Sequence, residues 1–169
     1  MTPGLYTASV PVFSHGLHVL ADLLRKGELH MRVQGTDPES LLDLRLAPDM
    51  LPLIGQVQRA SDHAKGASAR LAGLEPPSFA DAERSLADAY NRIDRTLTYI
   101  GTFSATAFEA APTRIVVLPF DEPPMPAAQY LYGFAMPSFF FHLTTAYAIL
   151  RHHGVTIGKR DFIGSLEST

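Results

Sequence analysis

The chain has 169 residues and a net charge of −3, with acidic and basic residues interspersed and no cysteine. This length predicts one domain, residues 1–169, that can bury a substantial core. The composition excludes disulfides, thiolate metal sites and a cysteine nucleophile, and the charge pattern lacks the basic patch of a nucleic-acid binder. Since no signal-peptide pattern is present and no apolar run approaches roughly 18 residues, we expect a cytoplasmic protein without nucleic-acid or membrane partners.

The first predicted helix carries apolar residues at alternating steps of three and four, namely Val10, Phe13, Leu17, Leu20 and Leu24. This spacing is typical of a helix that packs at a shallow angle on its neighbours. Gly35 is expected to end it. Asp37 followed by Pro38 then predicts an N-cap and the start of a short helix.

Two further helices are predicted in the middle of the chain. One runs from about Asp49 to Gly73, and its buried face is rich in alanine, so a neighbouring helix can approach closely. The next is expected to follow a cap at Ser78 and to end at Gly101. Its predicted seam consists of Phe79, Ala82, Leu86, Tyr90, Ile93, Leu97 and Ile100.

The last third of the chain changes in character. The β-branched residues and prolines between Thr113 and Pro126 predict a small hairpin or an extended loop. A fourth helix is predicted from about Ala128 to His153, kinked near Pro137 and ended by Gly154. An extended tail from Val155 to Thr169 is expected to dock through Phe162 and Ile163. Together these segments predict an all-α four-helix bundle with its hairpin or loop between helices three and four.

His142 lies in the otherwise almost wholly apolar stretch Pro137–Arg151. Its imidazole needs a partner, because an unsatisfied buried polar group costs roughly 1–3 kcal/mol. His63 lies at a matching depth of the second helix, on one stripe with Gln56 and small alanines. The two histidines therefore form a minimal metal or acid–base constellation. The alternative is a pair of buried histidines satisfied by hydroxyl groups.

The remaining histidines carry weaker signals. His15 and His18 share a helix edge but flank an apolar position, which favours a surface location, and His30 lies among polar residues. His152 and His153 fall in the last turn of the fourth helix, where a cation complements the helix dipole.

Several motifs in this chain resemble one family. They are Leu46–Leu53, Gln56–Gln58, Ser61–Lys65, Met136–His142, Tyr147–Arg151 and Gly158–Phe162. Together they resemble a domain-of-unknown-function branch of the DinB/YfiT-like superfamily, and the resemblance spans nearly the whole chain.

This resemblance implies a four-helix bundle with a divalent metal site, built from one histidine on helix two and a pair on helix four. His63 matches the first ligand and His142 the last, whereas the remaining ligand falls on Ser138. A neutral serine hydroxyl is a poor ligand for zinc or nickel, so the protein supplies two ligands that need a third group. Characterised superfamily members include thiol-dependent transferases and isomerases, which makes a low-molecular-weight thiol an expected cofactor. They often form homodimers.

Two functions remain open at this point. In the first, a divalent metal at His63 and His142, completed by water and Ser138, activates a bound thiol or water in a transferase- or hydrolase-like reaction. A small-molecule ligand would then be oriented by other pocket residues, namely Asp49, Gln56 and Tyr147, with Asp62 next to the site in sequence but about 100° away around the helix. In the second, the bundle is non-catalytic, binds a small molecule or dimerises, and uses the two histidines as a polar pair that fixes helix register.

Overall fold

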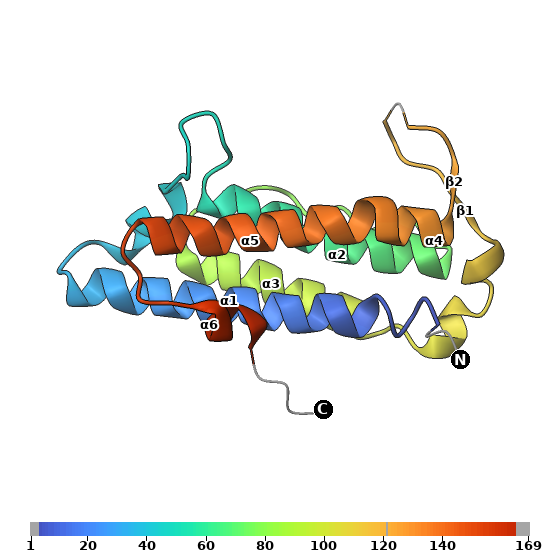
Figure 1. Ribbon diagram of the computed structural model, residues 1–169, viewed down its shortest axis with the longest axis horizontal. Coiled ribbons are helices and arrows are strands. Elements are labelled where there is room, and N and C mark those ends of the chain that lie inside the picture. Colours follow the sequence, from blue (N-terminus) through green and yellow to red (C-terminus); the bar gives the residue numbers. More distant parts are fainter. Residues whose placement is uncertain (1–3, 121, 165–169) are drawn as a thin grey trace.

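The computed structural model describes residues 4–120 and 122–164, and in it four long helical segments lie side by side as a bundle (Figure 1). Three of them are α1 (Val10–Val33), α2 (Leu53–Ala72) and α3 (Leu86–Ile100). The fourth runs continuously through α4 (Ala127–Tyr130), a π-helical turn η4 (Leu131–Ala135) and α5 (Met136–His152). The predicted all-α bundle is confirmed.

Short elements connect these helices. Three are 3₁₀ turns, η1 (Pro38–Asp43), η2 (Ala105–Phe108) and η3 (Ala111–Thr113). β1 (Ile115–Val116) pairs antiparallel with β2 (Met125–Pro126), so the hairpin expected before the fourth helix is present. In Figure 1 this hairpin stands at the end of the bundle where α1 begins.

The seam predicted for α1 is buried as expected, with its five residues no more than 5% exposed. Gly35 follows the helix with φ = +70°, a conformation that favours glycine. The Asp37 carboxylate accepts a hydrogen bond from the Glu39 backbone N–H, which confirms the predicted cap, although the helix that it starts is 3₁₀ rather than α.

The start of α2 was predicted four residues too early. The helix begins at Leu53 with Pro52 as its N-cap, while Asp49 lies exposed in the preceding loop. Ala60, Ala64 and Ala67 are fully buried. Because these side chains are small, α2 packs closely against α5, and this helix pair carries the two candidate histidines.

The start of α3 was also predicted wrongly, by seven residues. Ser85 is the true N-cap and accepts a hydrogen bond from the Asp88 backbone N–H. The segment from Ser78 to Arg84 is not helical, and it lies across α2 and α3. The Lys65 ammonium lies over the Phe79 ring, 4.0 Å from its centroid. Phe79 therefore contacts α2, although its position in the sequence matches the apolar spacing predicted for the third helix.

The fourth helix begins at Ala127 and ends at His152, close to the predicted bounds. A kink is predicted near Pro137, and the structure has a π-helical turn just before this proline. Proline cannot donate a backbone hydrogen bond to the preceding turn, so the regular pattern is interrupted there. Gly154 follows with φ = +91°, the predicted helix stop.

The tail differs from the expected extended segment because residues Lys159–Ile163 form a short helix, α6. Phe162 docks edge-on against Tyr147, with 5.8 Å between ring centroids. Ile163 is 38% exposed and is not an apolar anchor. The part of the predicted tail from 165 to 169 lies outside the described residues.

The expectation that no apolar stretch could span a bilayer needs correction. The helical stretch Ala127–His152 is long and apolar enough by length and composition, with a mean hydropathy of 1.2 in its most apolar window. Since α5 packs against α1 and α2 as a member of the bundle, this is weak evidence for a membrane span.

Candidate functional site

The structure brings His63 of α2 and His142 of α5 together. Their ring centroids are 5.4 Å apart and their planes lie within 15° of parallel. Both side chains are half-buried. The sequence predicts that the two imidazoles lie at matching depths of their helices. Because α2 and α5 pack antiparallel (Figure 1), these two positions meet side by side.

His142 has a specific partner, Gln56, one of the residues predicted to line the pocket. The Gln56 amide donates from Nε2 to the Leu51 carbonyl at 3.0 Å, which leaves its Oε1 as the acceptor. His142 Nδ1 lies 2.8 Å from that oxygen and must therefore carry the proton. The other ring nitrogen, Nε2, keeps its lone pair. Gln56 is only 1% exposed, so this arrangement is firmly held.

Both imidazoles are neutral at physiological pH. Burial lowers the pKa of His63 to about 4, and the proximity of His142 acts in the same direction. Burial also lowers the pKa of His142 to about 4, assisted by the Arg59 guanidinium. Neutral imidazoles are the form that binds metal ions or accepts protons.

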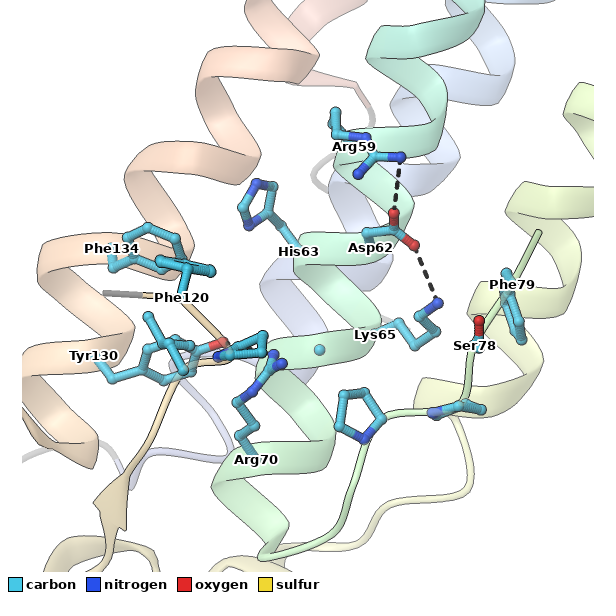
Figure 2. Close-up of a pocket in the computed structure, with 15 residues that line it drawn as sticks. Arg59, Asp62, His63, Lys65, Arg70, Ser78, Phe79, Phe120, Tyr130 and Phe134 are labelled. Carbon is cyan, nitrogen blue, oxygen red and sulfur yellow. Dashed lines mark hydrogen bonds and ion pairs between the residues drawn. The ribbon is translucent and has the colours of Figure 1, made fainter. Parts of the chain in front are cut away.

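His63 borders a cleft of about 390 Å³ between α2, the fourth helix, the hairpin and the segment that precedes α3 (Figure 2). One wall is aromatic: Phe134 meets His63 edge-on with 5.8 Å between centroids, and Tyr130 and Phe120 lie against Phe134. The volume is within the range of small-molecule sites, and the lining opposite the aromatic wall is polar, with Arg59, Asp62, Lys65 and Arg70.

Asp62 also borders the cleft, but it points about 100° away from His63 around α2, as the step between neighbouring helical residues requires. Figure 2 shows its carboxylate turned toward Lys65 and Arg59, away from His63. It lies 3.0 Å from the Lys65 ammonium and 2.9 Å from the Arg92 guanidinium. This pairing ties Asp62 to the neighbouring helix.

The Arg92 cluster was not predicted. We use this name for Arg92 and the three carboxylates around it, Asp62, Asp81 and Glu83. The Arg92 side chain is 1% exposed, and its guanidinium lies 3.0 Å from Asp81 and 2.8 Å from Glu83. These contacts fasten the segment before α3 onto the bundle. Their sequence signal is weak because the four residues are scattered over three parts of the chain.

Arg70 was also missed. Its Nη1 donates to the Tyr130 hydroxyl at 3.4 Å, inside the cleft. Gly66 makes room for it, because a Cβ at that position would lie 2.6 Å from Nη1. The spacing of His63, Gly66 and Arg70 at i, i+3 and i+7 places all three on one face of α2, and that pattern could have revealed the residue.

The other candidate residues contribute less. Ser138 is half-buried one turn before His142, on the same face of α5. Asp49 is exposed in the loop before α2, and Tyr147 packs against Phe162, so the structure does not bring these two residues into the cleft.

The remaining histidines lie away from the cleft. His15 and His18 are exposed, and His15 Nε2 lies 2.6 Å from the Ile163 carbonyl. His153 Nδ1 lies 2.8 Å from the Ile149 carbonyl in the last turn of α5, a helix-end contact.

His63 and His142 offer an ion at most two ligands. Two imidazoles that share one tetrahedral zinc, at Zn–N distances of ~2.0–2.1 Å, place their ring centroids roughly 5 Å apart. The separation here is close to that, but the rings are stacked within 15° of parallel, so one ring must turn before both in-plane lone pairs meet one ion. Within residues 4–120 and 122–164, however, no group of three or more His, Cys, Asp or Glu side chains could hold an ion. Any bound cation would need its other ligands from water or from a bound molecule.

Comparison with known proteins agrees with this architecture. Residues 5–163 match the family described as a domain of unknown function, DUF1993. The chain belongs to the DUF1993 family. The crystal structure of a DinB family member from Shewanella denitrificans, determined at 1.83 Å, is 38% identical in sequence. It superposes with a TM-score of 0.92 over 98% of this chain and 94% of that one, so the DUF1993 chain has a DinB-like fold. No curated protein matches the sequence.

Proposed function

We propose that this DinB-like protein binds a small molecule in the cleft beside His63 and holds a divalent cation, zinc or nickel, between His63 and His142. The observation that carries the proposal is the His142–Gln56 hydrogen bond. It fixes the protonated nitrogen as Nδ1 and leaves Nε2 with its lone pair, while the second imidazole stacks at a centroid separation of 5.4 Å. Metal-ligating histidines are commonly oriented in this way, by a hydrogen bond from the ring nitrogen that does not bind the metal.

The protein supplies only two ligands in this proposal, so the bound molecule or water completes the coordination. A cation held in this way would supply a Lewis acid that polarises a bound water or thiol, the chemistry of a transferase or hydrolase. Gln56 orients His142, and Phe134 contacts His63 edge-on. A low-molecular-weight thiol, homodimerisation and a cytoplasmic location remain predictions.

Zinc titration of the metal-free protein by calorimetry tests the proposal. The wild type should bind about one zinc per chain, and His63→Ala or His142→Ala should abolish that binding. His18→Ala is the matched control, because His18 is exposed on α1 and should not affect it. Ser138→His should strengthen zinc binding by adding a third imidazole one turn before His142. Wild-type protein that binds no zinc, or binding that survives both alanine variants, would overturn the assignment.

A second candidate is a non-catalytic bundle in which the histidines fix helix register. The observation that favours it is that His142 already has a protein partner in Gln56. In that case each single variant, Gln56→Leu or His142→Leu, leaves one buried polar partner without a hydrogen bond. The two single losses of stability should then add up to more than the loss in the double variant. Additive losses in a denaturation cycle would contradict this second function.

A further inference from the structure

We infer that the cleft beside His63 contains a carboxylate subsite at Arg70, and that its ligand is a small monocarboxylic acid with an apolar body. This inference names the ligand class of the small-molecule cleft in the proposed function and rests on it in that respect. It does not depend on the cation. Three observations carry it: the charges around the cleft, the glycine beneath Arg70, and the chemistry of the aromatic wall.

The first observation is an uneven pairing of cations. Arg59 and Lys65 border the cleft, but both are directed at carboxylates: Arg59 pairs with Asp81 and lies 3.4 Å from Asp62, and Lys65 lies 3.0 Å from Asp62. Arg70 differs. Within the described residues no Asp or Glu oxygen lies within 4.0 Å of it, and its hydrogen-bond partner is the neutral Tyr130 hydroxyl. Figure 2 shows its side chain reaching into the cleft.

The second observation is Gly66. A glycine inside a helix costs roughly 0.5–1 kcal/mol relative to alanine. Here the missing Cβ provides the space in which the Arg70 guanidinium lies back along α2, toward His63. Gly66 therefore gives up helix stability at the position where the Arg70 guanidinium, which has no carboxylate partner among the described residues, needs space, and this indicates a binding role for Arg70.

The third observation is the mixed chemistry of the surroundings. A guanidinium presents a planar fork that binds a carboxylate through two parallel hydrogen bonds. One unpaired cation balances one negative charge, which favours a carboxylate over a doubly charged phosphate. The Tyr130 hydroxyl supplies a further polar contact, and Phe120 and Phe134 offer an apolar surface between Arg70 and His63.

The geometry also orients the ligand. Arg70 lies seven residues after His63, about two helical turns, or roughly 10 Å, along α2. Because the guanidinium folds back over Gly66, a carboxylate bound there is closer to His63 than the Cα separation. A small arylalkanoic acid can therefore hold its charged end on Arg70 while its apolar body lies along Phe134 and its other end faces His63.

The test uses 3-phenylpropanoate as the probe and 3-phenylpropanamide, its neutral isostere, as the control ligand. Binding to the full chain is followed by calorimetry and by protein-observed NMR. We expect the acid to bind at least about tenfold more tightly than the amide, because hydrogen bonds to charged groups are stronger than neutral ones. Arg70→Gln should remove this preference. Arg151→Gln, an exposed arginine at the far end of α5, should leave it unchanged.

Gly66→Ala tests the position of the guanidinium, because the new Cβ would occupy the space in which Arg70 Nη1 lies. This variant should fold and should prefer the acid less strongly than the wild type does. Three results would overturn the subsite. They are equal binding of the acid and the amide, no binding of the acid at millimolar concentrations, and a preference for the acid that persists in Arg70→Gln. Zinc titration of the same samples separates the two proposals. Arg70→Gln should retain zinc binding, and a wild type that prefers the acid but binds no zinc would remove the cation and leave the subsite standing.

Discussion

Two neighbouring residues of α2 lead into two differently built regions. Asp62 faces the Arg92 cluster, in which a buried guanidinium meets three carboxylates and every charge has an opposite charge within 4.0 Å. His63 borders the cleft and stacks on His142 behind it, and both imidazoles are neutral; within the described residues, Arg70 meets a neutral hydroxyl and no carboxylate. Both regions are polar and both are partly buried.

The difference indicates which polar groups hold the fold and which are available to a ligand. A buried charge that is fully paired has little left to offer another molecule, and removing one partner leaves the others stranded. A polar group that is oriented by the protein but only partly satisfied keeps its binding capacity. The Arg92 cluster should therefore affect stability, and the cleft should affect binding.

The largest effect is expected in the Arg92 cluster. Arg92→Met should lower the free energy of unfolding by about 3 kcal/mol, because three carboxylates lose their shared cation. Burial raises the pKa of Glu83, but hydrogen bonds from Arg92 and Gln58 hold it below its usual value in the folded protein. Urea denaturation measures the loss. Arg95→Met on the same helix, where the guanidinium lies 4.2 Å from the Phe79 ring centroid, should cost no more than about 1 kcal/mol. Equal losses in the two variants would contradict the contrast.

Gln56 should affect binding rather than the fold alone. Gln56→Leu removes the acceptor that orients His142 and should weaken zinc binding roughly 10- to 100-fold. Gln56→Glu keeps an acceptor at the same position and should retain zinc affinity or raise it. Calorimetric titration of both variants gives the comparison, and an equal loss in both would show that Gln56 does not act through the His142 hydrogen bond.

The histidine pair should make stability depend on pH. In the folded protein both pKa values are lowered to about 4, whereas the unfolded chain takes up these protons near pH 6.5. Between those values the unfolded state binds more protons, so stability falls as the pH is lowered from about 6.5 to about 4. We expect a loss of about 1.5 kcal/mol for the pair, a figure discounted for partial solvent exposure.

Urea midpoints measured across this pH range test that loss. His63→Gln combined with His142→Gln should flatten this part of the profile, since neither replacement titrates. An unchanged slope in the double variant would assign the pH dependence to other groups.

The smallest change in stability is expected at Gly16 and Gly66, two glycines that both lie inside long helices. Gly66→Ala should stabilise the protein by up to about 1 kcal/mol, because the Arg70 side chain can move out of the way. Gly16→Ala should instead destabilise it, because the new Cβ would lie 2.5 Å from the buried Phe139 ring. Thermal unfolding of the two variants measures the opposite signs. A loss of stability in Gly66→Ala would show that Arg70 is fixed by more than the contacts described.

Much of the fold could be predicted because apolar periodicity reports helix packing directly, as in the buried seam of α1. The start of α3 could not be predicted in the same way. Phe79 matches the apolar spacing of that helix, yet it lies outside the helix and its ring contacts the Lys65 ammonium of α2. The histidine pair was within reach because each residue stands out in an apolar or alanine-rich stretch. The Arg92 cluster was not, because Asp62, Asp81, Glu83 and Arg92 meet only after three segments have packed together.

The π-helical turn Leu131–Ala135 affects which side chains of the fourth helix face α2 together. In an unbroken α-helix, Tyr130 and His142 are twelve residues apart and would point roughly 120° away from each other. The wider turn accommodates one additional residue and removes roughly 100° of that rotation, so the aromatic half and the imidazole half of the helix face α2 together. Deleting Gly133 together with the wide turn would leave eleven residues of regular helix between these two positions, which again places them roughly 20° apart. The π-helical turn thus absorbs one residue of the sequence without rotating the two halves of the helix away from each other.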